Sequence, residues 1–239
     1  MNYWLSREVL AWTPDVASWT STDPVRAKRP YEILAHAESV LANAQTALAL
    51  SDAILALKRV IDSRLRHLDE LYRFSARFPG NKVGALERLE QVGLAKPFVV
   101  KQLFEIRNDI EHRDLPPPSL NRAKELVDVA WYFLRATDQP CRCWPRELTL
   151  RSDALDGNGD KPWIIMCPPS SPSGMFRVSG WVPPQLIGRE DAGGSVEVRP
   201  LPETQLNPLR DGQTHVFGDA FMSPDTQREV WRLAFAGLD

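Results

Sequence analysis

The chain is poor in cysteine, with only Cys141, Cys143 and Cys167 among its 239 residues. An odd and sparse set of thiols does not make a disulfide framework, so we expect a reducing compartment, the cytoplasm. Cys141-x-Cys143 is too tight for an ordinary disulfide and has no evident histidine or cysteine pair to complete a zinc site. We therefore assign no metal ligands and expect no cofactor.

Long apolar runs and a secretory leader are also missing. No stretch approaches the ~18 uninterrupted apolar residues of a membrane span. The first residues, Met1 to Trp4, show neither a basic n-region nor an apolar h-region. The sequence therefore predicts a protein without a membrane partner.

The chain has no excess of positive charge either, since its formal net charge is -2. A strongly basic chain would indicate a nucleic-acid partner, and this balance leaves room only for a local basic groove. What the chain does have is 43% hydrophobic residues over 239 positions. That is enough for a sizeable core and favours two domains over one.

Helical periodicity dominates the middle of the chain. Residues 1–29 are interpreted as an irregular arm that carries tryptophans, and residues 30–138 as an antiparallel all-α bundle of four or five helices. The expected helices begin at Pro30, after Ser51-Asp52, near Lys82, at Pro97 and after Ser119. The three prolines Pro116–Pro118 end the fourth of them.

After Pro140 the character of the sequence changes, because prolines and glycines become dense and short runs alternate with turn signals. Residues 139–239 are predicted to form a small β-rich domain, a sandwich or barrel, with a last helix at Asp225–Phe235. The expected strands are Glu147–Arg151, Trp163–Cys167, Phe176–Val182, Val196–Arg199 and His215–Phe221. The predicted fold class is thus α+β, an N-terminal helical bundle followed by a small β-rich domain.

An arginine and a histidine, Arg107-x4-His112, lie on the fourth expected helix. The bare spacing carries little weight, because Arg210-x4-His215 and Arg29-x6-His36 match it as well. Only the position of each pair can distinguish them.

Helical geometry turns His112 away from the core of its own helix. At about 100° per residue, one narrow apolar stripe forms, and His112 lies roughly opposite to it. That stripe consists of Val99, Leu103, Ile106 and Ile110. Asn108 lies one turn before His112 and beside it. We expect both side chains to face solvent or a second chain.

These residue types suit the cleavage of RNA by its own 2′-hydroxyl. That reaction needs a base, an acid and a cation for the phosphorane charge; histidine serves the first two roles near neutral pH, and the planar fork of arginine serves the third. Two ordinary interpretations stay open: His112 as a solvated residue at a helix end, and Arg107 in a salt bridge to Glu111 or Glu105.

The order of the helices and the segment Ile106-Arg107-Asn108-Asp109-Ile110-Glu111-His112, with a polar residue directly after the arginine, resemble the HEPN superfamily. The resemblance covers about Tyr31–Asp138. It implies a metal-independent endoribonuclease that works as a homodimer, in which two copies of the motif meet. Toxins and antiphage effectors are typical members, and an antitoxin or other regulatory protein is an implied partner. Asp114 stands where antitoxin-silenced members often carry tyrosine.

The resemblance implies a role for each residue of the motif. His112 is then the general acid and base, Arg107 the phosphate contact, and Asn108 the residue that orients His112 or the RNA. Lys58, Arg59 and Arg113 are expected to bind RNA. The second helix also offers Arg64, Arg66 and His67, and this basic run is interpreted either as the edge of an RNA groove or as a solvated helix face. The alternative function is a non-catalytic HEPN module that binds RNA or a protein, with the β-rich domain as its interaction surface.

Overall fold

The structure, a computed structural model, describes residues 2–79, 83–154, 160–170, 174–189, 196–201 and 212–237. The chain divides into two compact units. The helical unit comprises Ser21–Ser75 and Pro79–Cys143, and the sheet unit comprises Met1–Thr20, Ala76–Phe78 and Trp144–Asp239.

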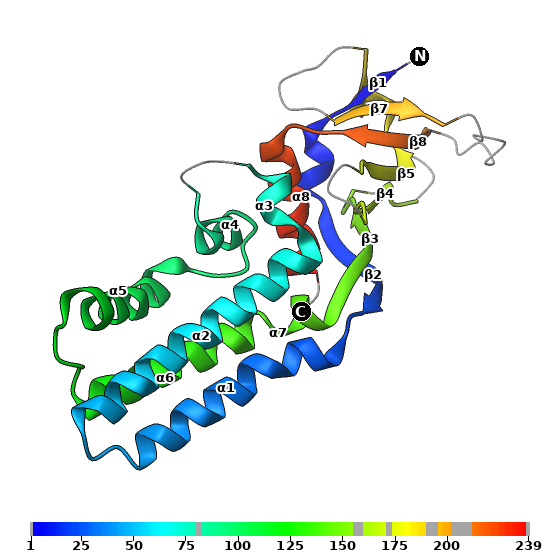
Figure 1. Cartoon of the computed structure of the whole chain (residues 1–239). Coiled ribbons are helices and arrows are strands. Elements are labelled where there is room, and N and C mark those ends of the chain that lie inside the picture. Colours follow the sequence, from blue (N-terminus) through cyan, green and yellow to red (C-terminus); the bar gives the residue numbers. More distant parts are fainter. Residues whose placement is uncertain are drawn as a thin grey trace. The chain divides into compact units, whose positions relative to one another are not determined.

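The helical unit is built on three long helices that pack side by side (Figure 1). These are α1 (Pro24–Ala42), α2 (Ala47–Tyr72) and α6 (Leu120–Ala136). Its remaining helices are α4 (Ala85–Gln91), α5 (Pro97–Arg113) and α7 (Asp138–Arg142). The short helix α3 (Phe74–Arg77) lies at the boundary, with Ala76 and Arg77 in the sheet unit. Helix α5 packs against α2 and α6. Among the described residues, none of the helices combines the length and the apolar character that crossing a membrane requires.

The first two helices begin earlier than the sequence predicts. Helix α1 begins at Pro24, where Asp23 accepts a hydrogen bond from the Val25 amide at 2.9 Å, so Pro30 lies inside the helix. Helix α2 begins at Ala47 behind the N-cap Thr46. Each true start carries the same kind of signal as the expected one, a capping side chain or a proline in the first turn, one to two turns upstream.

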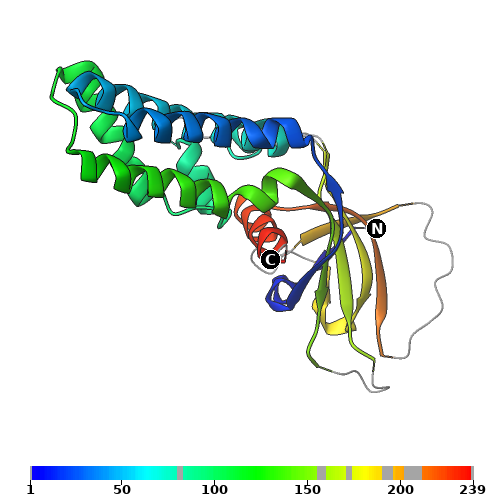
Figure 2. The same ribbon diagram turned by 90° about the horizontal axis from the view of Figure 1, so that it is seen from below.

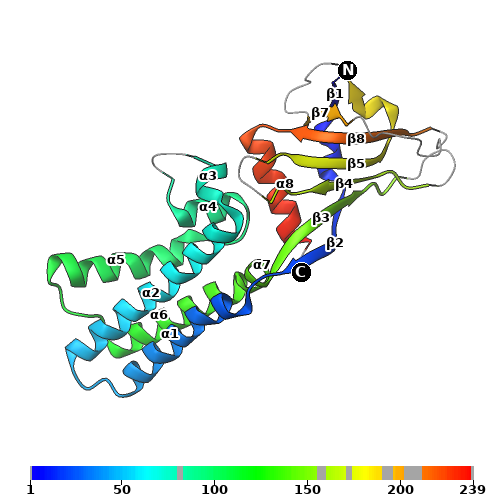
Figure 3. The same ribbon diagram turned by 45° about the vertical axis from the view of Figure 1, so that its right-hand side comes forward.

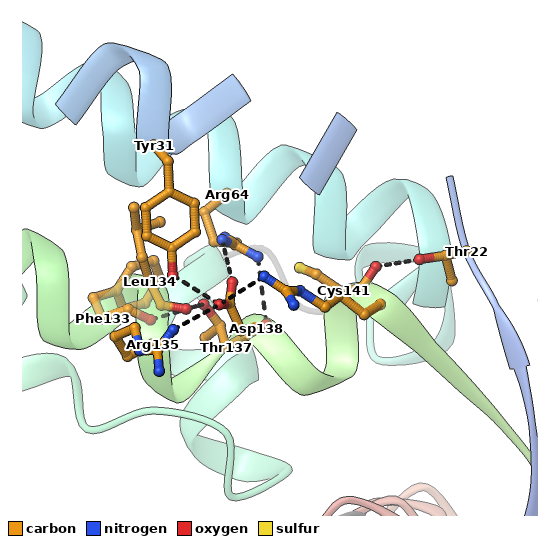
Figure 4. Close-up of polar contacts among 10 residues, drawn as sticks. Thr22, Tyr31, Arg64, Phe133, Leu134, Arg135, Thr137, Asp138 and Cys141 are labelled. Carbon is orange, nitrogen blue, oxygen red and sulfur yellow. Dashed lines mark hydrogen bonds and ion pairs between the residues drawn. The ribbon is translucent and has the colours of Figure 1, made fainter. Parts of the chain in front are cut away.

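A buried polar joint fastens α2 to the end of α6 and to α7 (Figure 4). Nη2 of Arg64 donates to Oδ1 of Asp138 at 2.8 Å, and the hydroxyl of Tyr31 donates to the other carboxylate oxygen at 2.8 Å. The Arg64 side chain is 0% exposed. We call these three residues the Arg64–Asp138 joint. Because a buried charge is tolerated only with a partner, the joint fixes the register of α2 against α7.

Among the described residues, the sheet unit contains one eight-stranded sheet with the order β2-β3-β4-β5-β8-β7-β1-β6. Figures 2 and 3 show this sheet from two directions. Its strands are β1 (Tyr3–Leu5), β2 (Thr13–Ser21), β3 (Cys143–Arg151), β4 (Trp163–Cys167), β5 (Phe176–Val182), β6 (Ile187–Gly188), β7 (Val196–Pro200) and β8 (Thr214–Phe221). Each of the strand pairings recorded for β1, β3–β5, β7 and β8 is antiparallel.

The core of the sheet unit gathers around Trp231 of α8 (Pro224–Ala236). Helix α8, capped by Ser223, lies along one face of the sheet (Figure 3). The Trp231 ring is fully buried, and its centroid lies 5.6 Å from that of Trp144 and 5.9 Å from that of Phe176. These edge-to-face contacts join the helix to β3 and β5.

The expected order, an N-terminal bundle followed by a small β-rich domain, is wrong, although the chain is α+β. Residues 1–29 are not an irregular arm, because Tyr3–Leu5 and Thr13–Ser21 form strands of the large sheet. Helices α1–α7 therefore lie between β2 and β3 in the sequence, and α8 follows β8. The sequence of β2 shows only a weak strand pattern, because β2 is an edge strand with Pro14 near its start and Val16 as its buried apolar residue.

Candidate functional site

The C-terminal half of α5 carries the predicted catalytic residues. The helix ends at Asp114, which adopts a left-handed conformation with φ 53°, and Asp109 accepts a hydrogen bond from the Leu115 amide at 3.1 Å. The prolines that follow cannot extend the helix. His112 and Arg113 thus lie in the last turn, where the helix dipole favours positive charge.

A single guanidinium joins the polar residues of this turn. Nη1 of Arg107 donates to Oδ1 of Asn108 at 2.9 Å and to Nε2 of His112 at 3.1 Å. Nη2 of Arg107 forms an ion pair with Glu111. We call Arg107, Asn108, Glu111 and His112 the α5 cluster.

The contact between Arg107 and His112 determines which imidazole nitrogen accepts a hydrogen bond. A guanidinium can only donate hydrogen bonds, so Nε2 of His112 has to accept with its lone pair. The proton of the neutral ring then resides on Nδ1.

The α5 cluster lies on the outward side of the helix. Asn108 and His112 are exposed, whereas Val100 and Leu103 are buried. The buried stripe differs from the predicted one, because Val99 is 46% exposed. A large substrate can reach only side chains on the outward side, which holds for Asn108 and His112, whereas the Arg107 side chain is 22% exposed.

The three predicted RNA contacts do not gather in one place. Lys58 forms an ion pair with Asp62, and its Nζ lies 6.0 Å from the centre of the Phe104 ring of α5. Arg113 is paired with Asp109 at 2.8 Å on the same helix as the α5 cluster. Arg59 lines a groove between α1 and α2. Arg113 is therefore the one next to the α5 cluster, and it is already paired.

The two other arginine–histidine patterns have different surroundings. Arg29 and His36 are exposed on α1, and no hydrogen bond joins them among the described residues. His215, on β8, stacks at a tilt on Trp181 with 4.9 Å between ring centroids, and burial lowers its pKa. Arg210 lies outside the described residues. Within the part of the chain that is described, the hydrogen-bonded pair is thus Arg107 with His112.

Sequence reasoning misplaced one basic residue and overlooked another. Arg64, considered for the edge of an RNA groove, is buried in the joint with Asp138. Arg29 of α1, which was not considered for binding, lines the same groove as Arg59. A helical wheel of α1 could have found it, because Arg26, Arg29 and Ile33 fall on one side of that helix at about 100° per residue.

The described residues contain no group of three or more His, Cys, Asp and Glu side chains placed to hold a metal ion. Comparison with known proteins finds no family model, no curated protein and no solved structure that matches the chain. The resemblance to the HEPN superfamily stays a prediction from the sequence.

Proposed function

We propose that the α5 cluster is one half of the active site of a metal-independent endoribonuclease, and that two copies of the chain complete it. The observation that supports this most is the hydrogen-bonded set of Arg107, Asn108 and His112 on the exposed side of α5. It places a phosphate-binding cation beside a group that can exchange a proton near neutral pH.

The reaction assigns a task to each side chain. The 2′-oxygen of the RNA attacks the phosphorus and gives its proton to an imidazole, while the bond from phosphorus to the 5′-oxygen breaks and that oxygen takes a proton from an acid. The products are a 2′,3′-cyclic phosphate and a 5′-hydroxyl. His112 exchanges the protons, and Arg107 binds the phosphate oxygens, whose negative charge grows in the transition state.

Substrate binding would also prepare the imidazole. In the free chain Nε2 of His112, the basic nitrogen, is occupied by Arg107. A phosphate is a stronger acceptor for the guanidinium than a neutral imidazole, because it is charged and matches the bidentate fork. Once Arg107 turns to the phosphate, Nε2 becomes free to accept the 2′-hydroxyl proton. Asn108 remains beside the ring to orient it or the RNA.

One chain does not supply both proton-transfer groups. The base and the acid act on opposite sides of the phosphorus, and the α5 cluster contains a single imidazole. The second imidazole has to come from a second copy whose α5 faces the first. This requirement, and not a contact in the structure, is why we propose a homodimer.

A non-catalytic role as an RNA- or protein-binding module is the second candidate, and Glu111 favours it. Its carboxylate forms an ion pair with the guanidinium that should bind phosphate, and the carboxylate is only partly exposed. An enzyme has to displace this carboxylate, whereas a module that uses α5 for another contact does not.

Cleavage of RNA in the presence of a chelator tests the proposal. The wild-type chain should cleave and leave 2′,3′-cyclic phosphate ends, and His112→Ala should reduce the rate by about 10²–10⁴-fold. His36→Ala is a matched control, since His36 is also an exposed histidine on a helix. Glu111→Gln should cleave at least as fast as the wild type. An inert wild type, or equal cleavage by His112→Ala, would refute the enzyme and leave the binding module.

The shared site has a test of its own. Specific activity should rise with protein concentration until the chain is fully dimeric by sedimentation. A chain that is monomeric throughout, or one whose specific activity is constant from monomer to dimer, contradicts a site built from two copies.

A further inference from the structure

A groove between α1 and α2 gathers arginines away from the α5 cluster. Two adjoining cavities of about 140 and 180 Å³ share Arg29, Ser63 and Arg66 in their walls. Arg59 lines the first and His67 lines the second. We call this surface the α1–α2 groove; it lies entirely within the helical unit.

The spacing along α2 makes the groove a continuous strip. Arg59, Ser63 and Arg66 fall within about 60° of one another on a helix of 3.6 residues per turn. Arg59 and Arg66 are two turns apart, which is about 10 Å along the axis. Arg29 faces them from α1. The cationic groups are thus spread along the groove and do not meet at one point.

The acidic residues of the groove are already paired with other bases. Asp62 forms its ion pair with Lys58, and Glu70 forms one with Arg26 at 2.5 Å. Arg29, Arg59 and Arg66 form no ion pair with any residue that the structure describes. Three arginines without an ion-pair partner, all of them exposed to solvent, therefore line one small groove, and a bound anion would lower their mutual repulsion.

His67 adds a buried imidazole to the wall. The residue is only 5% exposed, and its Nδ1 has no hydrogen-bond partner among the described residues. A buried polar atom without a partner is rare, because it forfeits its bonds to water without replacement. Burial, assisted by the charge of Arg64, lowers the pKa of His67, so the ring is neutral near pH 7. His67 therefore adds an uncharged imidazole to the arginine-lined wall.

We infer that the α1–α2 groove binds phosphate groups through Arg29, Arg59, Arg66 and Ser63. Guanidinium groups match phosphate oxygens in charge and geometry, and the Ser63 hydroxyl can donate one more hydrogen bond between them. Phosphate groups occur both in small phosphorylated molecules and along a nucleic-acid strand. The inference goes beyond the ribonuclease proposal and does not depend on it, since none of these residues belongs to the α5 cluster.

Binding is measured with two probes. Inorganic pyrophosphate is titrated into the full chain in a calorimeter, and a fluorescent single-stranded RNA is followed by anisotropy at several salt concentrations. The His112→Ala chain is used for the RNA, so that cleavage cannot disturb the measurement. Saturable binding of pyrophosphate identifies a pocket for small phosphorylated molecules, whereas binding of RNA alone identifies a track for a strand. Both results support the phosphate site.

Substitutions then locate the site. Arg59→Gln and Arg66→Gln should each weaken binding by about tenfold, and arginine to lysine should weaken it less. For RNA, each lost phosphate contact should also lower the salt slope by about 0.7. Glu70→Gln should strengthen binding, because it releases Arg26 and removes a negative charge. Lys28→Gln is the control, because it removes one positive charge, as each arginine variant does. Lys28 is exposed on α1 and does not line the groove, so this variant should bind like the wild type.

The outcomes separate clearly when circular dichroism shows that the variants are folded. Failure of both probes to bind overturns the inference, and so does a Lys28→Gln variant that weakens binding as much as the groove variants. Because binding is scored without cleavage, loss of the ribonuclease proposal would leave this result unchanged.

Discussion

The Arg64–Asp138 joint should respond asymmetrically to the removal of its two charges. Asp138→Leu leaves a guanidinium that is 0% exposed, with weak acceptors such as the Thr137 carbonyl oxygen at 3.5 Å. Arg64→Met leaves a carboxylate that is 12% exposed and still accepts from Tyr31 at 2.8 Å. Arg142 lies 3.4 Å from the same carboxylate. The carboxylate thus keeps partners that the guanidinium lacks.

These differences set the expected magnitudes. Removing the partner of a buried charge costs about 3–5 kcal/mol, which is the free energy we expect Asp138→Leu to lose. Arg64→Met should cost about 1–2 kcal/mol, because the remaining carboxylate is still hydrogen-bonded. The double variant should be more stable than Asp138→Leu alone, since an apolar pair of similar volume leaves no charge buried.

Urea unfolding followed by circular dichroism gives the free energy of unfolding for the four chains. Hydrogen exchange with mass spectrometry on peptides of α2 and α6 assigns the loss to the helical unit. An Asp138→Leu variant that loses less than about 1 kcal/mol would show that the charge is not buried as the structure has it. So would a double variant whose loss equals the sum of the two single losses.

Three further outcomes follow from buried groups. Gly180→Ala should destabilise the sheet unit by about 1–3 kcal/mol in thermal unfolding, because the new Cβ would lie 2.3 Å from the Trp163 carbonyl oxygen; an unchanged melting temperature contradicts this. Tyr72→Phe should cost about 1–3 kcal/mol, since its buried hydroxyl donates to two backbone carbonyls at 2.7 and 3.0 Å; urea unfolding checks it. Burial lowers the pKa of His67, so the unfolded chain binds more protons as the pH falls through about 6.5, and the helical unit loses stability there. His67→Gln should show a shallower pH profile, and parallel profiles would refute the cause.

Patterns that depend on neighbours in sequence were predicted well. The expected runs Trp163–Cys167 and Phe176–Val182 coincide with β4 and β5. The last helix begins behind Ser223, one of the two caps considered. Alternation of apolar and polar residues, turn residues and capping side chains predict these segments, and all of these patterns extend over only a few residues.

The topology could not be predicted in the same way. Strand β1 has three residues and pairs with β7 and β6, so Leu5 lies opposite Val196 and Ile187. A three-residue strand is too short to show alternation, and its partners are nearly two hundred residues away. Nothing local distinguishes such a strand from an arm.

The α5 cluster depends on residues that are close in sequence, whereas the α1–α2 groove depends on how two helices pack. The cluster spans positions i to i+5 of one helix, so the sequence alone could place Arg107 beside His112 and Asn108. The groove needs α1 and α2 to face each other in one particular register. That register determines that Arg29 meets Arg59 and Arg66, and it depends on packing that no short motif records.

The basic residues of α2 show why a count of charges does not locate a binding surface. Lys58 finds Asp62 one turn away, and Arg64 finds Asp138 at a separation of 74 residues. Arg59 and Arg66 form no ion pair with any described residue, although Asp62 and Glu70 line the same groove. The sequence alone does not distinguish these four basic residues, and the fold determines which of them form ion pairs within the chain. An anion can bind where the neighbouring carboxylates are already paired with other bases, so the cationic surface is defined by the placement of the carboxylates as much as by that of the arginines.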